Sequence, residues 1–159
     1  MTRYFRQYFH SDPMLELDES TAQRRGSYVA EVEGAIRVFR CFANHKLESL
    51  VYPGWDDPAT PLADARRRAE AVPIAVYSPV QDRPDGGKAW RVWYADAGGE
   101  IQSILEPELD AEGRYLRESR RGPDGQLRDS QEYVYDRYGE LLEVVTRGAD
   151  GRVLNRQHA

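Results

Sequence analysis

The sequence predicts a mainly β protein, an open and twisted antiparallel meander of β-hairpins with one short α-helix. The first observation behind this prediction is the spacing of six glycines from Gly87 to Gly151, which follow one another at intervals of 12, 14, 12, 14 and 12 residues. The second is that residues 122–125 (Gly-Pro-Asp-Gly) recur as residues 148–151 (Gly-Ala-Asp-Gly), 26 residues later. A fixed period in this range is typical of stacked supersecondary units. Apolar positions also align across the three repeats: Trp90, Leu116 and Leu142, then Ile101, Leu127 and Val153.

The elements before the repeats are mostly strands. Residues 4–9 are rich in aromatic side chains and predict a first strand, whereas residues 11–25 are polar and predict a loop. Apolar and polar residues alternate over residues 27–42, which predicts a hairpin that turns at residues 33–34. Asn44 and His45 predict a further turn, because Asn tolerates the left-handed backbone conformation.

One segment has helical features. Residues 61–71 predict a helix, with Thr60 as its cap, Pro61 at its first position and Asp64 in its first turn. A strand is then expected over residues 73–80. We expect residues 1–80, with their strands and helix, and the repeats of residues 81–159 to form one continuous domain.

The repeats predict antiparallel strands, because short turns join segments of about eight to ten residues. Both glycine intervals are even, so equivalent side chains stay on the same face of the sheet. The apolar residues suffice to cover one face, and we expect the N-terminal strands and the helix to cover it. The last strand, residues 151–157, is polar and suits the edge of the sheet.

Composition narrows the classes of function. The net charge is −5, which argues against nucleic acid and favours a basic protein as partner. Cys41 is the only cysteine, so an intrachain disulfide is excluded. The sequence has no apolar run of membrane-spanning length and no histidine pair with metal-ligand spacing. We therefore expect a cytoplasmic protein with no membrane contact, no metal and no cofactor.

Residues 132–141 (Glu-Tyr-Val-Tyr-Asp-Arg-Tyr-Gly-Glu-Leu), which run on to Gly151 and Val153, resemble the YD repeats of Rhs-type proteins. Those repeats carry a Tyr-Asp-x-x-Gly-x-Leu core, matched here by Tyr135, Asp136 and Gly139, and a second glycine about a dozen residues later. The pattern is also similar to the short, MORN-like hairpin-repeat proteins of bacterial toxin–antitoxin and immunity loci. The resemblance covers about the last 70 residues. It implies a hairpin meander and brings no catalytic residue with it, and fewer than three full units of 26 residues do not predict an Rhs shell.

Several residues could carry chemistry, and each has a structural interpretation that we favour. Cys41 lies in an alternating strand and suits a small buried apolar residue better than a nucleophile paired with His45. The recurrent turn aspartates suit bonds to the amides of their own turns, since turns one repeat apart are too distant to share a calcium ion. The arginine run of residues 66–68 could bind an anion but more often forms a solvated helix face.

Aromatic residues offer the best candidate surface. Tyrosine gives a large contact area at a low entropic cost, so a polar sheet face that carries tyrosines is a plausible binding surface. The partner-binding candidates are Trp93, Tyr94, Tyr133, Tyr135 and Tyr138.

Three hypotheses of function follow. The favoured one is a non-catalytic protein-binding module, most concretely an immunity or antitoxin protein that occludes a basic toxin domain. The second is a structural protein that forms a homodimer through residues 151–157. The third is a small enzyme that uses His45 with carboxylates such as Glu31, Glu33 or Glu48.

Overall fold

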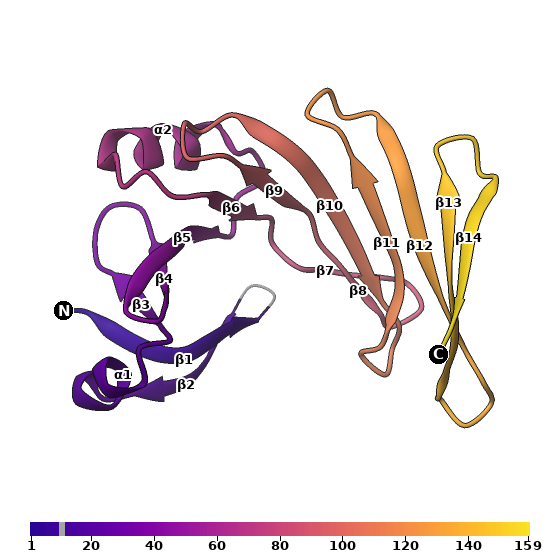
Figure 1. The fold of residues 1–159 in the computed structure, drawn as a ribbon, viewed down its shortest axis with the longest axis horizontal. Helices are drawn as coiled ribbons and strands as arrows, with labels where there is room; N and C mark the ends of the chain where they lie inside the picture. The colour runs from indigo at the N-terminus through magenta and orange to yellow at the C-terminus, as the bar shows by residue number, and fades with distance from the viewer. Residues whose placement is uncertain (10–11) are drawn as a thin grey trace. The chain divides into compact units, whose positions relative to one another are not determined.

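The computed structural model describes residues 1–9 and 12–159, and over these residues the predicted mainly β fold is confirmed (Figure 1). The described residues contain 14 strands in a mostly antiparallel open sheet, together with two helices. The chain divides into two compact units. Unit 1 comprises Met1–Pro79 and Val92–Ile101, and unit 2 comprises Val80–Arg91 and Gln102–Ala159.

Unit 1 contains seven strands in the hydrogen-bonded order β9-β6-β5-β4-β3-β1-β2. The hairpin predicted over residues 27–42 is present as β3 and β4, and the turn at Asn44 and His45 is confirmed by positive φ angles of 49° and 63°. The strands are β1 (Arg3–Phe9), β2 (Asp12–Leu17), β3 (Tyr28–Val32), β4 (Val38–Ala43), β5 (Lys46–Pro53), β6 (Ile74–Tyr77) and β9 (Val92–Ala95).

Helix α2 (Ala59–Arg68) interrupts the meander, because it connects β5 and β6 as parallel neighbours. The predicted helix over residues 61–71 is therefore shifted. Ala69 adopts a left-handed conformation with φ 52° and its N–H donates to Ala65 O, which ends the helix there. Thr60 lies inside the helix instead of capping it, and the Ala59 N–H donates to Asp57 Oδ1 at 2.8 Å.

A second helix was not predicted. The expectation of a loop over residues 11–25, of which position 11 lies outside the described residues, is wrong, because β2 and α1 (Glu19–Arg25) form there. Asp18 caps α1 by accepting from the Thr21 N–H at 2.9 Å, and Gly26 ends it with φ 71°. Strand β2 lies at the end of the strand order, where a proline is tolerated.

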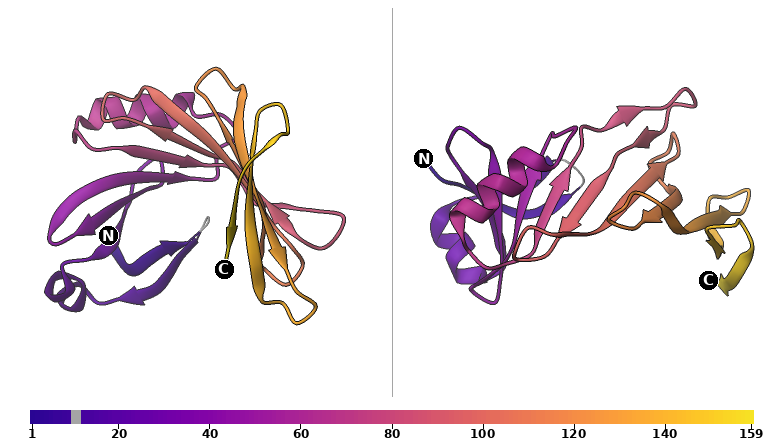
Figure 2. Two further views of the ribbon diagram at one scale, coloured as in Figure 1. Left: turned by 45° about the vertical axis from the view of Figure 1, so that its right-hand side comes forward. Right: turned by 90° about the horizontal axis from the view of Figure 1, so that it is seen from above.

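Unit 2 is the predicted hairpin meander, with strands in the order β14-β13-β12-β11-β10-β8-β7. Its turns alternate between the two ends of the strands, as expected from the glycine spacing (Figure 2). The last strand, β14, lies at the end of this order, which confirms the predicted edge position. The strands are β7 (Gln81–Asp82), β8 (Lys88–Ala89), β10 (Ile101–Leu109), β11 (Tyr115–Arg121), β12 (Leu127–Tyr135), β13 (Leu141–Gly148) and β14 (Val153–His158).

The turns use the predicted chemistry. Gly139, for example, has φ 86°, and its N–H donates to Asp136 O at 3.1 Å. The Asp136 carboxylate accepts from the Tyr138 and Glu140 amides, so the predicted structural role of the turn aspartates is confirmed. The first turn differs from the prediction: Gly86, not Gly87, takes the positive φ.

The two units differ in how their apolar side chains are buried. In unit 1, β5 and β6 present Leu50, Tyr52, Ile74 and Val76 in register on one face, and all four are buried. Unit 2 buries only a few large apolar residues among those described, namely Trp90, Ile104, Leu109 and Val145. Both helices belong to unit 1. Whether the N-terminal part covers the repeat sheet stays a prediction.

Candidate partner-binding surface

The strand register assigns the side chains of unit 2 to two faces of its sheet. Glu118 lies opposite Pro107 on one side and Gln131 on the other, and Tyr133 lies opposite Val144. Side chains directly opposite each other on neighbouring strands share a face, and alternate residues of a strand do so too. Tyr115 shares this face with Glu118 despite the odd spacing, because a register shift places it opposite Leu109, two residues from Pro107. Leu142 lies two residues from Val144. We call the face that carries Tyr115, Glu118, Tyr133, Tyr135 and Leu142 the tyrosine face.

Ring packing and hydrogen bonds hold the tyrosine face together. The rings of Tyr115 and Tyr133 lie 5.6 Å apart between centroids, and the Tyr133 hydroxyl donates to Gln131 Oε1 at 3.2 Å. The Tyr135 hydroxyl donates to the Tyr115 carbonyl oxygen at 2.6 Å. The Arg114 guanidinium stacks on the Tyr135 ring at 4.8 Å from its centroid. Tyr133 and Tyr135 therefore lie on one face, as their spacing predicts, and both are partly accessible.

Glu118 is a charged group of this face that sequence reasoning missed; Arg120 and Asp129 lie on the same face. Glu118 is half-buried, and burial raises its pKa against the attraction of Arg120. The Arg120 guanidinium donates to Asp129 instead. Within the residues that the structure describes, no hydrogen bond or ion pair engages the Glu118 carboxylate. Burial and the nearby charge of Glu118 also raise the pKa of Tyr133, consistent with their proximity.

The opposite face of unit 2 is covered by ion pairs that repeat with the period of the sequence. Arg121 pairs with Glu106, and Arg147 pairs with Glu132 one repeat later at 3.2 Å. Arg121 and Arg147 also donate to the carbonyl oxygens of equivalent turn glycines, at 3.2 Å and 3.1 Å. These contacts neutralise that face internally, so the unengaged carboxylate of Glu118 distinguishes the tyrosine face.

The other predicted partner-binding residues are placed differently. Trp93 is only 6% exposed and belongs to the core of unit 1, so we leave it out of the surface that we propose. Tyr94, on the opposite side of β9, is 37% exposed. Tyr138 is 75% exposed at the turn between β12 and β13, where the Arg137 guanidinium stacks on its ring at 4.7 Å. Trp93 and Tyr94 thus belong to unit 1, and the three other candidates belong to unit 2.

Unit 1 contains a second aromatic group that the sequence did not indicate. Tyr28 stacks on Phe42 at 4.7 Å, and Tyr4 meets Tyr28 edge-on at 5.9 Å. Arg40 lies over the Phe42 ring at 5.4 Å and pairs with Glu70 at 3.3 Å. The guanidinium of Arg40, from the same chain, therefore already occupies the cation-binding position of this aromatic group.

Two of the three carboxylates considered for an enzyme are engaged in ion pairs. Glu31 pairs with Arg37 at 2.7 Å, Glu33 pairs with the terminal amine of Met1, and Glu48 is exposed. His45 packs against Gly26 at the end of α1.

Cys41 has the features of a structural cysteine. Burial raises the pKa of its thiol, although a hydrogen bond with Ser49 acts in the opposite sense. A raised thiol pKa lowers the fraction of reactive thiolate at neutral pH.

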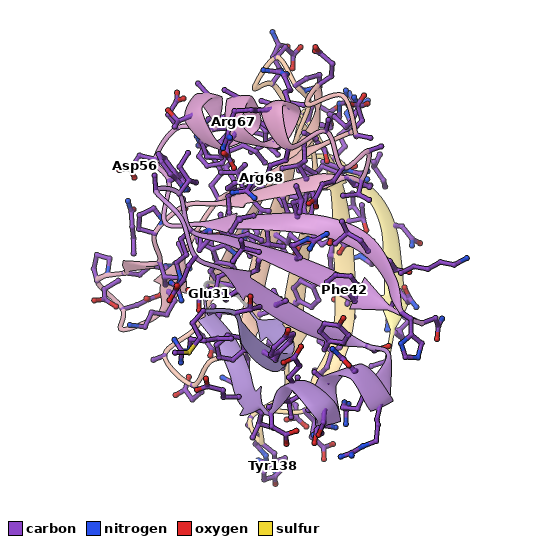
Figure 3. The ribbon with its side chains drawn as sticks, turned by 90° about the vertical axis from the view of Figure 1, so that its left-hand side faces the viewer. Glu31, Phe42, Asp56, Arg67, Arg68 and Tyr138 are labelled. Carbon is purple, nitrogen blue, oxygen red and sulfur yellow. The ribbon has the colours of Figure 1, made fainter. Side chains whose placement is uncertain are left out.

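The arginine run of α2 is used within the protein. Arg67 and Arg68, which Figure 3 labels, donate to the Asp64 carboxylate at 2.5 Å and 2.6 Å. Arg66 donates to the carbonyl oxygens of residues 98 and 99. Asp64 also accepts from the Tyr52 hydroxyl at 2.9 Å. These contacts connect α2 to β5, and they account for the run without an external anion.

Comparison of the chain with protein-family models, with curated proteins and with solved structures gives no match. Among the described residues, no group of three or more His, Cys, Asp or Glu side chains could hold a metal ion. Neither described helix has the length and apolar character needed to cross a membrane.

Proposed function

We propose that this chain is a non-catalytic protein-binding module, and most concretely a bacterial immunity or antitoxin protein that occludes a toxin domain. The observation that carries the proposal is the position of its exposed apolar side chains. Of nine large apolar residues exposed among those described, six lie within residues 134–154. Scattered exposed apolar residues are ordinary, whereas their concentration in neighbouring hairpins is typical of an interaction surface. The six are Val134, Tyr138, Leu141, Leu142, Val153 and Leu154; Leu141 and Leu142 lie on the tyrosine face, and Val134 and Val153 lie on the opposite face.

Charge and aromatic content support the same function. The net charge of −5 favours association with a basic partner. Tyr133 and Tyr135 are half-buried and held by hydrogen bonds, so little side-chain freedom is lost when a partner covers them. We therefore place the contact on the tyrosine face and on the exposed turn at Tyr138.

The proposal is tested by capturing a partner with the tagged full-length chain and measuring the affinity of the purified pair by calorimetry. Leu142 is 49% exposed on the tyrosine face, and Leu142→Ser should weaken binding about tenfold. Leu15→Ser, at an exposed leucine of unit 1, is the matched control and should leave the affinity unchanged. If no partner encoded beside the gene is captured, or if the two variants bind equally well, the proposal is wrong.

Self-association is the second candidate, because β14 is an open edge whose six residues are all exposed. The Ala159 N–H donates inward to Leu142 O, so the alternation of an antiparallel ladder directs the Arg156 N–H outward. Arg156→Pro removes that donor from the edge, and Arg156→Ala is its control. Light scattering should show a dimer that only the proline variant disrupts, and a monomer at high concentration would exclude this function.

A further inference from the structure

The tyrosine face contains a site suited to one kind of side chain. Glu118 on β11 and Tyr133 on β12 lie on one face at diagonal positions, since Glu118 is opposite Gln131. Diagonal neighbours on adjacent strands lie within reach of long and aromatic side chains. The ring of Tyr115 packs against Tyr133 at 5.6 Å and widens the aromatic surface beside the carboxylate.

We propose that Glu118 and Tyr133 bind a basic side chain, an arginine or a lysine, of the protein partner. The cation would contact the π-face of Tyr133 and pair with the Glu118 carboxylate. Both interactions gain strength when water is excluded from a half-buried position. The inference rests on the proposed function and names the chemistry of the partner at this site.

The charges around the site favour a cation from outside the unit. At the other aromatic groups, an arginine of the chain already fills the place of such a ligand: Arg40 over Phe42, and Arg114 over Tyr135. The Tyr133 ring has no such arginine within the described part of the chain. Arg120, whose charge acts on Glu118, donates to Asp129. An incoming basic side chain would complete the pattern that the other aromatic groups show.

Ligand binding should also explain why a half-buried acid is present at this position. Burial raises the pKa of Glu118, so its ionised form is costly in the free protein. A cation placed beside the carboxylate offsets that cost and lowers the pKa again. Complex formation should therefore become weaker as the pH falls and Glu118 is protonated.

The test uses acetyl-Gly-Arg-Gly-amide as a probe that carries one cation, with acetyl-Gly-norleucine-Gly-amide as the neutral control. Both are titrated into the isotope-labelled full-length protein and followed by amide chemical shifts. The arginine peptide should shift the amides of Glu118, Gln131 and Tyr133 in a saturable way at millimolar concentration, and the norleucine peptide should not. Absence of saturable shifts at these three residues would overturn the proposal.

Variants separate the site from general electrostatics. Glu118→Gln should lower the affinity for the arginine peptide about fivefold, as expected when a charge-assisted contact is lost. Asp124→Asn removes the same charge from an exposed turn of unit 2 outside the proposed surface, keeps the acceptor for the Gln126 N–H, and should have no effect. Glu118→Gln should fold normally, because it replaces a carboxylate whose burial is unfavourable. Equal weakening by the two variants would contradict a specific site.

The captured partner provides the last readout. Its affinity should fall at least fivefold with Glu118→Gln and remain unchanged with Asp124→Asn. If the partner binds both variants like the parent protein, the protein-binding function stands and this inference fails. If capture yields no partner, the function fails as stated, and the peptide titration alone decides whether the site binds a basic side chain.

Discussion

Removing one hydroxyl from the core of unit 1 tests how α2 is fixed to the sheet. Tyr52 is 0% exposed, and its hydroxyl donates to the Asp64 carboxylate at 2.9 Å. Asp64 is itself only 5% exposed, so water cannot replace a lost donor. Tyr52→Phe retains the ring and deletes this bond, together with the contact of the hydroxyl with Arg68. The expected result is a lower free energy of unfolding.

The magnitude follows from the bonds that remain. A hydrogen bond to a charged group contributes about 1.5–3 kcal/mol. Asp64 keeps its bonds from Arg67 and Arg68, so we expect the lower end, about 1.5 kcal/mol. For a chain of this length, that loss lowers the Tm by about 3–6 °C. Asp64→Asn should cost more, about 3 kcal/mol, because it leaves the partly buried Arg68 without its counter-charge.

The dependence on pH gives an independent check. Burial would raise the pKa of Asp64, but the bonds from Arg68, Arg67 and Tyr52 outweigh it and hold the pKa below its ordinary value. A carboxyl whose pKa is lowered by folding stabilises the protein above its unfolded-state pKa, about 4, and that stabilisation disappears as the pH falls through the folded-state value. The difference between the parent protein and Tyr52→Phe should therefore shrink below about pH 4.

Urea denaturation followed by tryptophan fluorescence measures these differences. Tyr28→Phe is the matched control, since Tyr28 is half-buried and its ring stacks on Phe42 without a described hydroxyl contact. The double variant Tyr52→Phe with Asp64→Asn should lose less than the sum of the single losses, because the two residues share one bond. Additive losses, or a Tyr52→Phe variant as stable as Tyr28→Phe, would refute the reasoning.

Two further predictions concern the turns and the cysteine. Gly125→Ala should lower the unfolding free energy by about 1–2 kcal/mol for its positive φ alone, because no atom lies near the added methyl group. Gly139→Ala should lower it slightly more, because the Arg114 guanidinium, 2.7 Å from the new atom, must shift away from its contacts with Asp110 and the Tyr135 ring. Chemical denaturation compares the two variants. Equal losses of unfolding free energy would show that Arg114 adds no cost at Gly139. Cys41 should react with iodoacetamide more slowly than a free thiol at pH 8, because burial raises its pKa, and its rate should continue to rise at higher pH. A rate equal to that of free cysteine would show that the thiol is not protected.

Sequence reasoning succeeded where one residue type dictates the backbone. Glycine takes a left-handed conformation at no steric cost, so the glycine spacing located the turns at residues 99, 113, 125, 139 and 151. It failed for α1, because Ala22 is the only buried residue of that helix and no apolar period marks it. It also missed the parallel pairing of β5 with β6, since hydrophobic periodicity does not report which strands are neighbours.

The candidate site was harder to predict because a single extra residue decides which face Glu118 occupies. The turn of the β11–β12 hairpin is closed by a bond from the Gly122 N–H to Gln126 O. If both strands continued from this pair without an extra residue, Glu118 would lie opposite Ser130. Ser130 is three residues from Tyr133 on the same strand, so Glu118 would then lie on the face away from Tyr133. The register shifts by one residue beside Arg121, and Glu118 therefore pairs with Gln131 on the tyrosine face.

That shift has a cause that can be recognised in the sequence. Equivalent shifts occur at the start of each repeat hairpin, beside residues 109, 121, 135 and 147, and each is accompanied by a turn glycine with a φ of 80–86°. A left-handed glycine that follows a tight turn is typical of a bulged hairpin, in which one extra residue enters one strand. Once every such glycine is counted as a bulge, the sequence places Glu118 beside Tyr133. The glycine that makes the turn thus also determines which side chains reach the proposed partner.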